Sequence, residues 1–204
     1  MTKGRFITFE GIDGAGKSSH IDAVVERLRE RGAAVVGTRE PGGTPLAERV
    51  REIFLNESAD VLTETLLAFA ARRDHVRAVI APALSAGQTV VCDRFTDATF
   101  AYQGGGGGAS EAQLVQLESW VLEGLQPDLT IWFDLPAALA AQRRGQARAA
   151  DRFEQRDLAF FERVRGAYAA RAGASPSRFA RIDAALDRDA VWRQIEAALE
   201  VRGW

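Results

Sequence analysis

Residues 11–18 read Gly-Ile-Asp-Gly-Ala-Gly-Lys-Ser and match in full the pattern G-x-x-x-x-G-K-[ST] of a phosphate-binding loop. A short apolar run at 5–10 precedes the loop, and apolar residues on one helical face follow it, at Ile21, Val24, Val25 and Leu28. The motif thus lies between a predicted strand and a predicted helix, as it requires. Its glycines let backbone N–H groups surround phosphate oxygens, Lys17 can reach the β- and γ-phosphates, and the Ser18 hydroxyl can bind Mg²⁺. The alternative, a turn without a ligand, gives no packing reason for Lys-Ser at a helix start.

Strand-like and helical segments alternate along the whole chain. Strands are expected at 5–10, 33–38, 88–92, 129–135 and 178–182, and helices at 17–31, 44–56, 60–85, 110–124, 136–144, 153–171 and 187–201. Ser110 with Gln113 forms a candidate capping box, and Asp187 a candidate cap of the last helix. Apolar strands between helices predict a parallel sheet covered on both faces. We therefore expect a three-layer α/β/α P-loop NTPase fold with five parallel strands, in one domain spanning 1–204.

Composition narrows the range of partners. The chain has 26 Lys plus Arg and 28 Asp plus Glu, so its net charge of −2 gives no general attraction to nucleic acid or to an anionic membrane. The one cysteine, Cys92, lies in an apolar run and is expected to be a small buried residue rather than a reactive thiol. No segment resembles a signal peptide or a membrane span. We expect a cytoplasmic protein with neither nucleic acid nor membrane as partner.

Charged side chains follow the predicted strands, and ligands of parallel sheets bind beyond the strands' carboxyl ends. Arg39 opens the turn 39–44 and could bind phosphate or lie solvated at the surface. Asp93 could hold Mg²⁺ through water or orient an acceptor phosphate, and Arg94 could stabilise a transferred phosphoryl group. The alternative is an Asp–Arg salt bridge. The five glycines at 104–108 could form a flexible linker or let backbone approach a ligand.

Four segments in this order and spacing, GIDGAGKS, TREPGGT, CDRFTDATFAYQGGG and ADRFEQ, resemble the bacterial thymidylate kinases, a family of P-loop nucleoside-monophosphate kinases. The resemblance covers essentially the whole chain, and its second and third segments are more specific than the phosphate loop. It implies transfer of the γ-phosphoryl group of ATP to dTMP, giving dTDP and ADP, in dTTP biosynthesis. It also implies ATP and Mg²⁺ as cofactors, with Ser18 and Asp93 as the metal residues, and a homodimer.

The resemblance also implies roles for individual residues. ATP would bind at Gly11, Ile12, Asp13, Gly14, Ala15, Gly16, Lys17, Ser18 and Ser19. For dTMP, Asp13 would contact the sugar 3′-OH region, Arg39 and Arg94 the phosphate, and Arg72 the thymine carbonyl O4. Phe69 would stack on the base, Thr99 and Gln103 would lie in its pocket, and the Tyr102 ring would occupy the space of a ribose 2′-OH. Phe69 and Tyr102 could instead be core residues.

Position 14 divides this family. Some members carry an arginine at this position of the phosphate loop. Others have glycine there and supply basic residues from a lid. Gly14 predicts that this chain belongs to the group with a basic lid. The arginine-rich lid would be residues 142–154, with Arg148 and Arg152 catalytic beside Lys17, Asp93 and Arg94, and with Arg143 and Arg144 at ATP. A solvated basic loop is the alternative. The chain departs from the family pattern at Ala98, where Ser is common, and at Gly107, where Arg is common.

Other functions are also compatible with these motifs. A kinase for another monophosphate, such as dUMP, dCMP or a guanylate, would share most of these motifs. A P-loop switch GTPase usually carries Asn-Lys-x-Asp, which this chain lacks because its one asparagine is Asn56. A switch ATPase would hydrolyse ATP without an acceptor. Neither His20 nor His75 is expected to be a general base; surface or capping roles are expected for both.

Overall fold

Five parallel strands form a single sheet at the centre of the computed structural model, which describes residues 4–144, 153 and 156–204. The strands are β1 (Phe6–Gly11), β2 (Val35–Arg39), β3 (Thr89–Asp93), β4 (Leu129–Asp134) and β5 (Phe179–Asp183). Their order across the sheet is β2-β3-β1-β4-β5, and every pair is parallel. All residues of β1 and β4 are buried, because helices cover both faces of these central strands.

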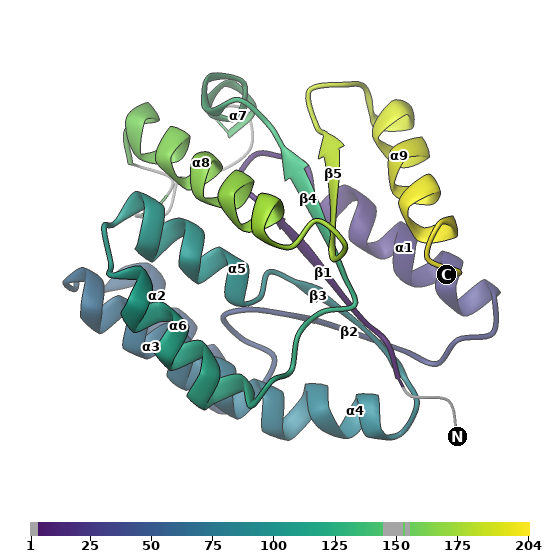
Figure 1. Cartoon of the computed structure of the whole chain (residues 1–204), viewed down its shortest axis with the longest axis horizontal. Helices are drawn as coiled ribbons and strands as arrows, with labels where there is room; N and C mark the ends of the chain where they lie inside the picture. Colours follow the sequence, from purple (N-terminus) through teal and green to yellow (C-terminus); the bar gives the residue numbers. More distant parts are fainter. Residues whose placement is uncertain (1–3, 145–152, 154–155) are drawn as a thin grey trace.

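The helices form the outer two layers (Figure 1). On one face lie α1 (Ser18–Glu30) and α9 (Arg188–Glu200). The other face carries α3 (Val61–His75), α4 (Ala81–Ser85), α5 (Thr96–Thr99) and α8 (Leu158–Ala174), with α2 (Pro45–Asn56) and α6 (Glu111–Leu122) outside them and α7 (Ala137–Arg144) after β4. The predicted three-layer α/β/α fold is confirmed. Among the described helices, none is long and apolar enough to cross a membrane.

Side-chain caps fix the start of four helices. Thr44, Asp60, Asp157 and Asp187 each accept a backbone N–H from the first turn of the helix that follows. The predicted cap at Asp187 is confirmed by its 2.8 Å bond from the Ala190 N–H. Ser110 does stand at the start of α6, but its side chain makes no capping bond, so the predicted capping box is wrong.

The predicted helix 60–85 is observed as a continuous helical run with a π-helix, η1 (Val76–Ile80), between α3 and α4. A second π-helix, η2 (Phe100–Gly106), follows α5 and includes three of the five consecutive glycines. A Cβ at Gly105 would lie 2.5 Å from the Cβ of Ala167, and one at Gly106 would lie 2.5 Å from the Phe160 ring. These glycines therefore allow η2 to pack closely against α8, and the first three of the five are helical rather than a flexible linker.

The carboxyl ends of the strands meet at one edge of the sheet. Strand register places Asp93 beside Arg39 on one side and beside Phe9 on the other, and Gly11 beside Phe133. The loops after β1, β2 and β3 consequently lie together, which brings the predicted functional residues of these three loops into one region.

Candidate active site

The phosphate loop joins β1 to α1, as its sequence context predicts. Gly11, Gly14 and Gly16 all have positive φ, at 138°, 86° and 88°. A Cβ at Gly11 would lie 2.6 Å from the Phe133 carbonyl oxygen, so only glycine fits there. Lys17, the N-cap residue of α1, makes no side-chain capping bond, so its side chain leaves the first N–H groups of the helix available to an anion.

The Lys17 side chain lies inside this loop and contacts its backbone. Its Nζ atom donates to the carbonyl oxygens of Gly11 at 3.2 Å and Ile12 at 3.4 Å, and the residue is only 6% exposed. Burial lowers the pKa of Lys17, and the positive charge of Arg94 lowers it further. The carbonyl oxygens of Gly11 and Ile12 carry only partial negative charge. A phosphate group bound in the loop would stabilise the charged Lys17 ammonium more strongly.

Arg94 links the phosphate loop to the neighbouring cleft. Its Nη1 atom donates to the Gly11 carbonyl at 2.9 Å, and its Nη2 atom pairs with Asp13 at 2.5 Å and Tyr102 Oη at 3.2 Å. Tyr102 in turn donates to the second carboxylate oxygen of Asp13 at 2.7 Å. Burial alone would raise the pKa of Asp13, but Arg94, Lys17 and the Tyr102 bond lower it to about 2. Asp13 is therefore ionised at neutral pH.

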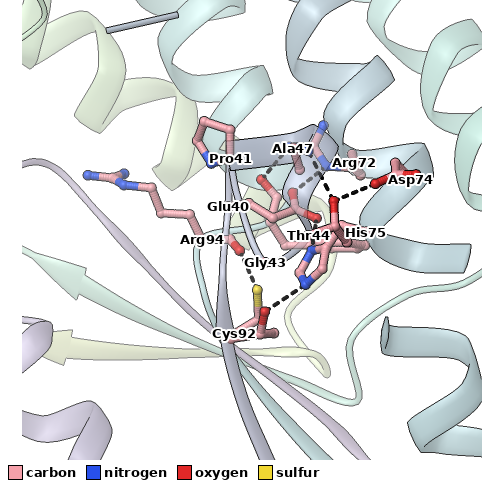
Figure 2. Close-up of polar contacts among 12 residues, drawn as sticks. Glu40, Pro41, Gly43, Thr44, Ala47, Arg72, Asp74, His75, Cys92 and Arg94 are labelled. Carbon is pink, nitrogen blue, oxygen red and sulfur yellow. Dashed lines mark hydrogen bonds and ion pairs between the residues drawn. The ribbon is translucent and has the colours of Figure 1, made fainter. Parts of the chain in front are cut away.

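The cleft beside Arg94 contains a second buried cation, Arg72. Its Nε atom pairs with Glu40 at 2.7 Å (Figure 2). Its Nη2 atom donates to Phe95 O at 3.0 Å and to Thr99 Oγ1 at 3.1 Å. Its remaining donor, Nη1, is buried and has no hydrogen-bond partner among the described residues. The cleft encloses about 720 Å³, a volume that includes space open to solvent, and it has both apolar and charged side chains in its lining.

Asp93 and Ser18 fit a hydrated divalent cation. The Oδ1 atom of Asp93 is buried and unpartnered among the described residues, and the charge of Asp93 acts on Lys17 in the phosphate loop. Ser18 is exposed in the first turn of α1. Mg²⁺ usually takes one or two protein oxygens and completes its shell with water and substrate phosphates. Among the described residues, no group of three or more His, Cys, Asp or Glu is arranged so that it could hold a metal ion.

Comparison with known proteins identifies the family. The family model described as thymidylate kinase matches residues 9–195. Thymidylate kinase from Albidiferax ferrireducens is 56% identical over 211 residues, covering 100% of this chain and 98% of the relative. That from Paracidovorax citrulli is 58% identical over 209 residues, covering 98% and 95%. The chain belongs to the thymidylate kinase family. A crystal structure of the Ehrlichia chaffeensis thymidylate kinase superposes with a TM-score of 0.81 at 35% identity, covering 97% of this chain and 99% of that one.

Most predicted dTMP residues of this thymidylate kinase family member line the cleft. Asp13, Arg72, Arg94, Thr99, Tyr102 and Gln103 all do so. Ala98, one of the departures from the family pattern, lies on the lining as well. The structure thus brings together residues from the phosphate loop, α3, α5 and η2, which are far apart in the sequence.

Two predicted residues lie elsewhere. The Arg39 guanidinium pairs with Glu48 at 3.0 Å, and its side chain is 56% exposed, outside the cleft lining. Phe69 is 2% exposed and packs with Phe100 and Leu114, also outside the lining. The Arg72 guanidinium lies 4.9 Å from the centre of the Phe69 ring, so this ring makes a cation–π contact with the arginine.

Three residues of α2 that were not predicted as site residues lie on the cleft lining: Arg51, Phe54 and Leu55. The Arg51 side chain is fixed by a 2.9 Å bond to the Pro41 carbonyl oxygen. A usable signal existed: Ala47, Arg51 and Phe54 recur at i, i+4 and i+7, so an arginine lies on the buried face of this helix.

The predicted lid falls mostly outside the described residues. Arg148 and Arg152 are not among them, and of Arg144 only the backbone is described. The Arg143 Nη1 atom donates to the Ala184 carbonyl oxygen at 2.9 Å, just beyond β5. Phe153 is 6% exposed, lines the cleft and stacks on Phe54 with ring centroids 5.1 Å apart.

Proposed function

We propose that this enzyme transfers the γ-phosphoryl group of ATP to the 5′-phosphate of dTMP, giving dTDP and ADP. Membership of the thymidylate kinase family supports the reaction and both substrates. The observation in this chain that carries the proposal is the position of Arg94. Its guanidinium bonds the phosphate loop at Gly11 and the cleft at Asp13 and Tyr102, so it lies between a donor site and an acceptor site.

The donor half is the phosphate loop. Backbone N–H groups of residues 11–19 would bind the ATP phosphates, and Lys17 would exchange its two carbonyl partners for β- and γ-phosphate oxygens. Ser18 and Asp93 would hold Mg²⁺, with the orphan carboxylate oxygen of Asp93 supporting this role. When bound, the ion neutralises charge that develops on the phosphate oxygens. Arg143 and Arg144 would contact ATP from the lid side.

The acceptor half is the cleft. The unpartnered Nη1 donor of Arg72 suits the O4 carbonyl of thymine, and the side chains of Thr99 and Gln103 lie on the same lining. Phe54 offers the aromatic surface that sequence analysis sought in Phe69. Asp13 would accept a bond from the sugar 3′-OH, since its carboxylate is ionised at neutral pH.

Two arginines are candidates for holding the acceptor phosphate together with Arg94. Arg51 lines the cleft already. Arg39 would have to leave Glu48 to reach it, and its phosphate role stays a prediction.

The chemistry requires positioning and charge rather than a strong base. A phosphate monoester is already nucleophilic near neutral pH, so direct in-line transfer needs no covalent enzyme intermediate. Lys17 and Arg94 would stabilise charge spread over the transferring phosphoryl group, and Arg148 and Arg152 would add to it from the lid. Closure of the lid would also exclude water from the reacting atoms. The cytoplasmic location stays a prediction.

We also propose that the enzyme is a homodimer. Large apolar side chains remain exposed on the neighbouring helices α3 and α6: Leu62 is 45% exposed, Leu66 49% and Trp120 65%. A second copy that covers this face would bury them. Sedimentation at several concentrations should give a dimer mass for the wild type and a monomer mass for Trp120→Glu; a monomeric wild type would contradict the proposal.

The decisive experiment for the reaction measures ADP release in a coupled assay. With dTMP present, ADP should form stoichiometrically with dTDP, and without an acceptor the rate should fall to background. A switch ATPase would instead release ADP without any acceptor. Parallel assays with dUMP, dCMP and GMP test the other monophosphate kinases, and a higher kcat/KM for any of these than for dTMP would contradict the substrate assignment.

A further inference from the structure

His75, the last residue of α3, is fully buried at 0% exposure. The expected surface or capping role is therefore wrong. Both ring nitrogens are hydrogen-bonded. The Nδ1 atom bonds to Glu40 Oε1 at 2.9 Å (Figure 2), and the Nε2 atom bonds to Thr38 Oγ1 at 2.7 Å. A carboxylate can only accept hydrogen bonds, so the Nδ1 atom carries the hydrogen and donates to Glu40.

The same carboxylate also holds Arg72. Glu40 Oε2 accepts from Arg72 Nε at 2.7 Å while Oε1 accepts from His75, so the two oxygens have different partners. Arg72 and His75 are three residues apart on α3, and Glu40 lies in the loop after β2. A carboxylate bonded at one oxygen can still rotate, whereas one bonded at both has a fixed plane. His75 therefore fixes the plane of the acceptor to which the Arg72 guanidinium binds.

The turn after β2 encloses this contact. A Cβ at Gly43 would lie 2.5 Å from His75 Nε2 and 2.6 Å from Thr38 Oγ1, so the backbone itself covers the pair. Thr44, which caps α2, also donates a hydrogen bond to Asp74 on α3 and ties the turn to that helix. The segment from Thr38 to Thr44, whose functional meaning in the sequence was limited to Arg39, thus builds a dry site around His75.

We propose that His75 is a positioning residue for recognition of the pyrimidine base, acting on Arg72 through Glu40. The Arg72 guanidinium is planar and is hydrogen-bonded at Nε and Nη2. These two bonds fix the orientation of the third nitrogen, Nη1, which has no partner among the described residues. Without the His75 bond, the Glu40 carboxylate and the Arg72 guanidinium can rotate together. The Nη1 donor of Arg72 then no longer points toward the carbonyl O4 of thymine. The proposal rests on the assignment of the cleft to dTMP.

Enzyme kinetics give the first test, with the full-length enzyme. His75→Leu should raise KM for dTMP by about tenfold, a change of about 1.4 kcal/mol, and should leave KM for ATP near the wild-type value. Its preference for dTMP over dCMP should fall, because dCMP carries an amino group in place of O4. His75→Asn should recover part of both losses, since the amide Nδ2 can donate to Glu40. Thr38→Val should show a smaller change in the same direction.

The matched control is Leu84→Ala on α4, which perturbs a neighbouring core cluster without touching these bonds. It should lose stability and keep the wild-type KM for dTMP. If His75→Leu does not fold, Thr38→Val and His75→Asn still test the proposal. An unchanged KM and an unchanged dTMP preference in the His75 variants would overturn it, as would equal losses in His75→Leu and His75→Asn.

Arginine ¹⁵N NMR tests the positioning without substrate, so that its failure is distinct from failure of the kinase assignment. The Arg72 Nε–H signal, assigned with Arg72→Lys, should be sharp and slow to exchange in the wild type and in Leu84→Ala. In His75→Leu it should broaden and exchange rapidly with water. A signal that stays sharp in His75→Leu would overturn the proposal whatever the enzyme phosphorylates.

Discussion

The hydroxyl group of Tyr102 gives a direct test of the acceptor site. It donates to Asp13 Oδ2 at 2.7 Å and accepts from the Asp13 backbone N–H and from Arg94 Nη2, each at 3.2 Å. The substitution Tyr102→Phe removes these contacts and keeps the ring, which meets Phe153 and Phe160 edge-on. Shape at the sugar is therefore kept while hydrogen bonding is lost.

The expected loss of stability follows from the charge on Asp13. A hydrogen bond to an ionised group contributes about 1.5–3 kcal/mol, so we expect the free energy of unfolding to fall by about 2 kcal/mol. For a chain of this length, that is a decrease in Tm of roughly 4–8 °C. Arg94 stays paired with Asp13 through the other oxygen, so no charge is left without its partner. The pKa of Asp13 should rise from about 2, because the Tyr102 bond is one of the interactions that lower it.

Urea denaturation and kcat/KM with dTMP and ribothymidine monophosphate measure the two effects separately. Tyr102→Phe should keep the preference for the deoxy sugar within about threefold, and Tyr102→Ala should lose most of it, if the ring excludes the 2′-OH. Tyr168→Phe is the control: its hydroxyl donates to Glu10 at 2.8 Å and accepts from Arg94, but it does not line the cleft. It should lose less stability than Tyr102→Phe, because Glu10 has a pKa of about 8 and is mostly protonated near neutral pH, and it should keep the wild-type KM for dTMP.

Two results would refute the reasoning. A Tyr102→Phe variant as stable as the wild type would mean that its three bonds contribute nothing. A Tyr102→Ala variant with the wild-type sugar preference would mean that Tyr102 is only a core residue and that selection lies elsewhere.

Three further predictions concern charge. Lys17→Ala should lower kcat by about a hundredfold or more with the fold intact, and near wild-type turnover in a folded variant would refute the loop assignment. Replacing Arg148 and Arg152 together by Gln should lower kcat more than it raises KM for dTMP; an unchanged kcat with a raised KM would place them at the acceptor. Burial raises the pKa of Glu10 to about 8, so the folded state binds more protons than the unfolded state and the free energy of unfolding should fall between about pH 5 and pH 8. Glu10→Gln should flatten that fall in urea titrations, and an unchanged slope would refute it.

Local patterns predicted the fold well. Every predicted strand is present within two residues of its expected bounds. The central strands β1 and β4 are fully buried and mostly apolar, as expected for a parallel sheet that is covered on both faces. The glycine run at 104–108 was the hard case. Glycine normally disfavours a helix, and only the close approach of α8 explains why residues 104–106 are helical. Such a contact joins segments about sixty residues apart and leaves no local signal.

The residues of the candidate site also differ in how well the sequence predicts their positions. Asp93 and Arg94 could be located because they follow a strand whose carboxyl end faces the ligand edge. Arg39 has the same kind of position, but Glu48 on α2 lies close enough to pair with it and turns it away from the cleft. The burial of His75 could not be predicted either. Its partners Thr38 and Glu40 lie more than thirty residues away in the sequence and reach it only in the folded chain.

Arg94 shows why a strand end alone does not fix a functional side chain. Its φ of 67° is unusual for a residue other than glycine, and such a backbone is kept only where surrounding contacts hold it. Three contacts do so: the Arg94 N–H donates to the Phe9 carbonyl, the Cys92 thiol donates to the Arg94 carbonyl at 3.0 Å, and the Phe95 N–H donates to Glu10 at 2.7 Å. Cys92 is buried as predicted, yet its hydrogen bond also supports the backbone that carries Arg94. The direction of this guanidinium, between phosphate loop and cleft, is therefore set by buried polar groups on β1 and β3.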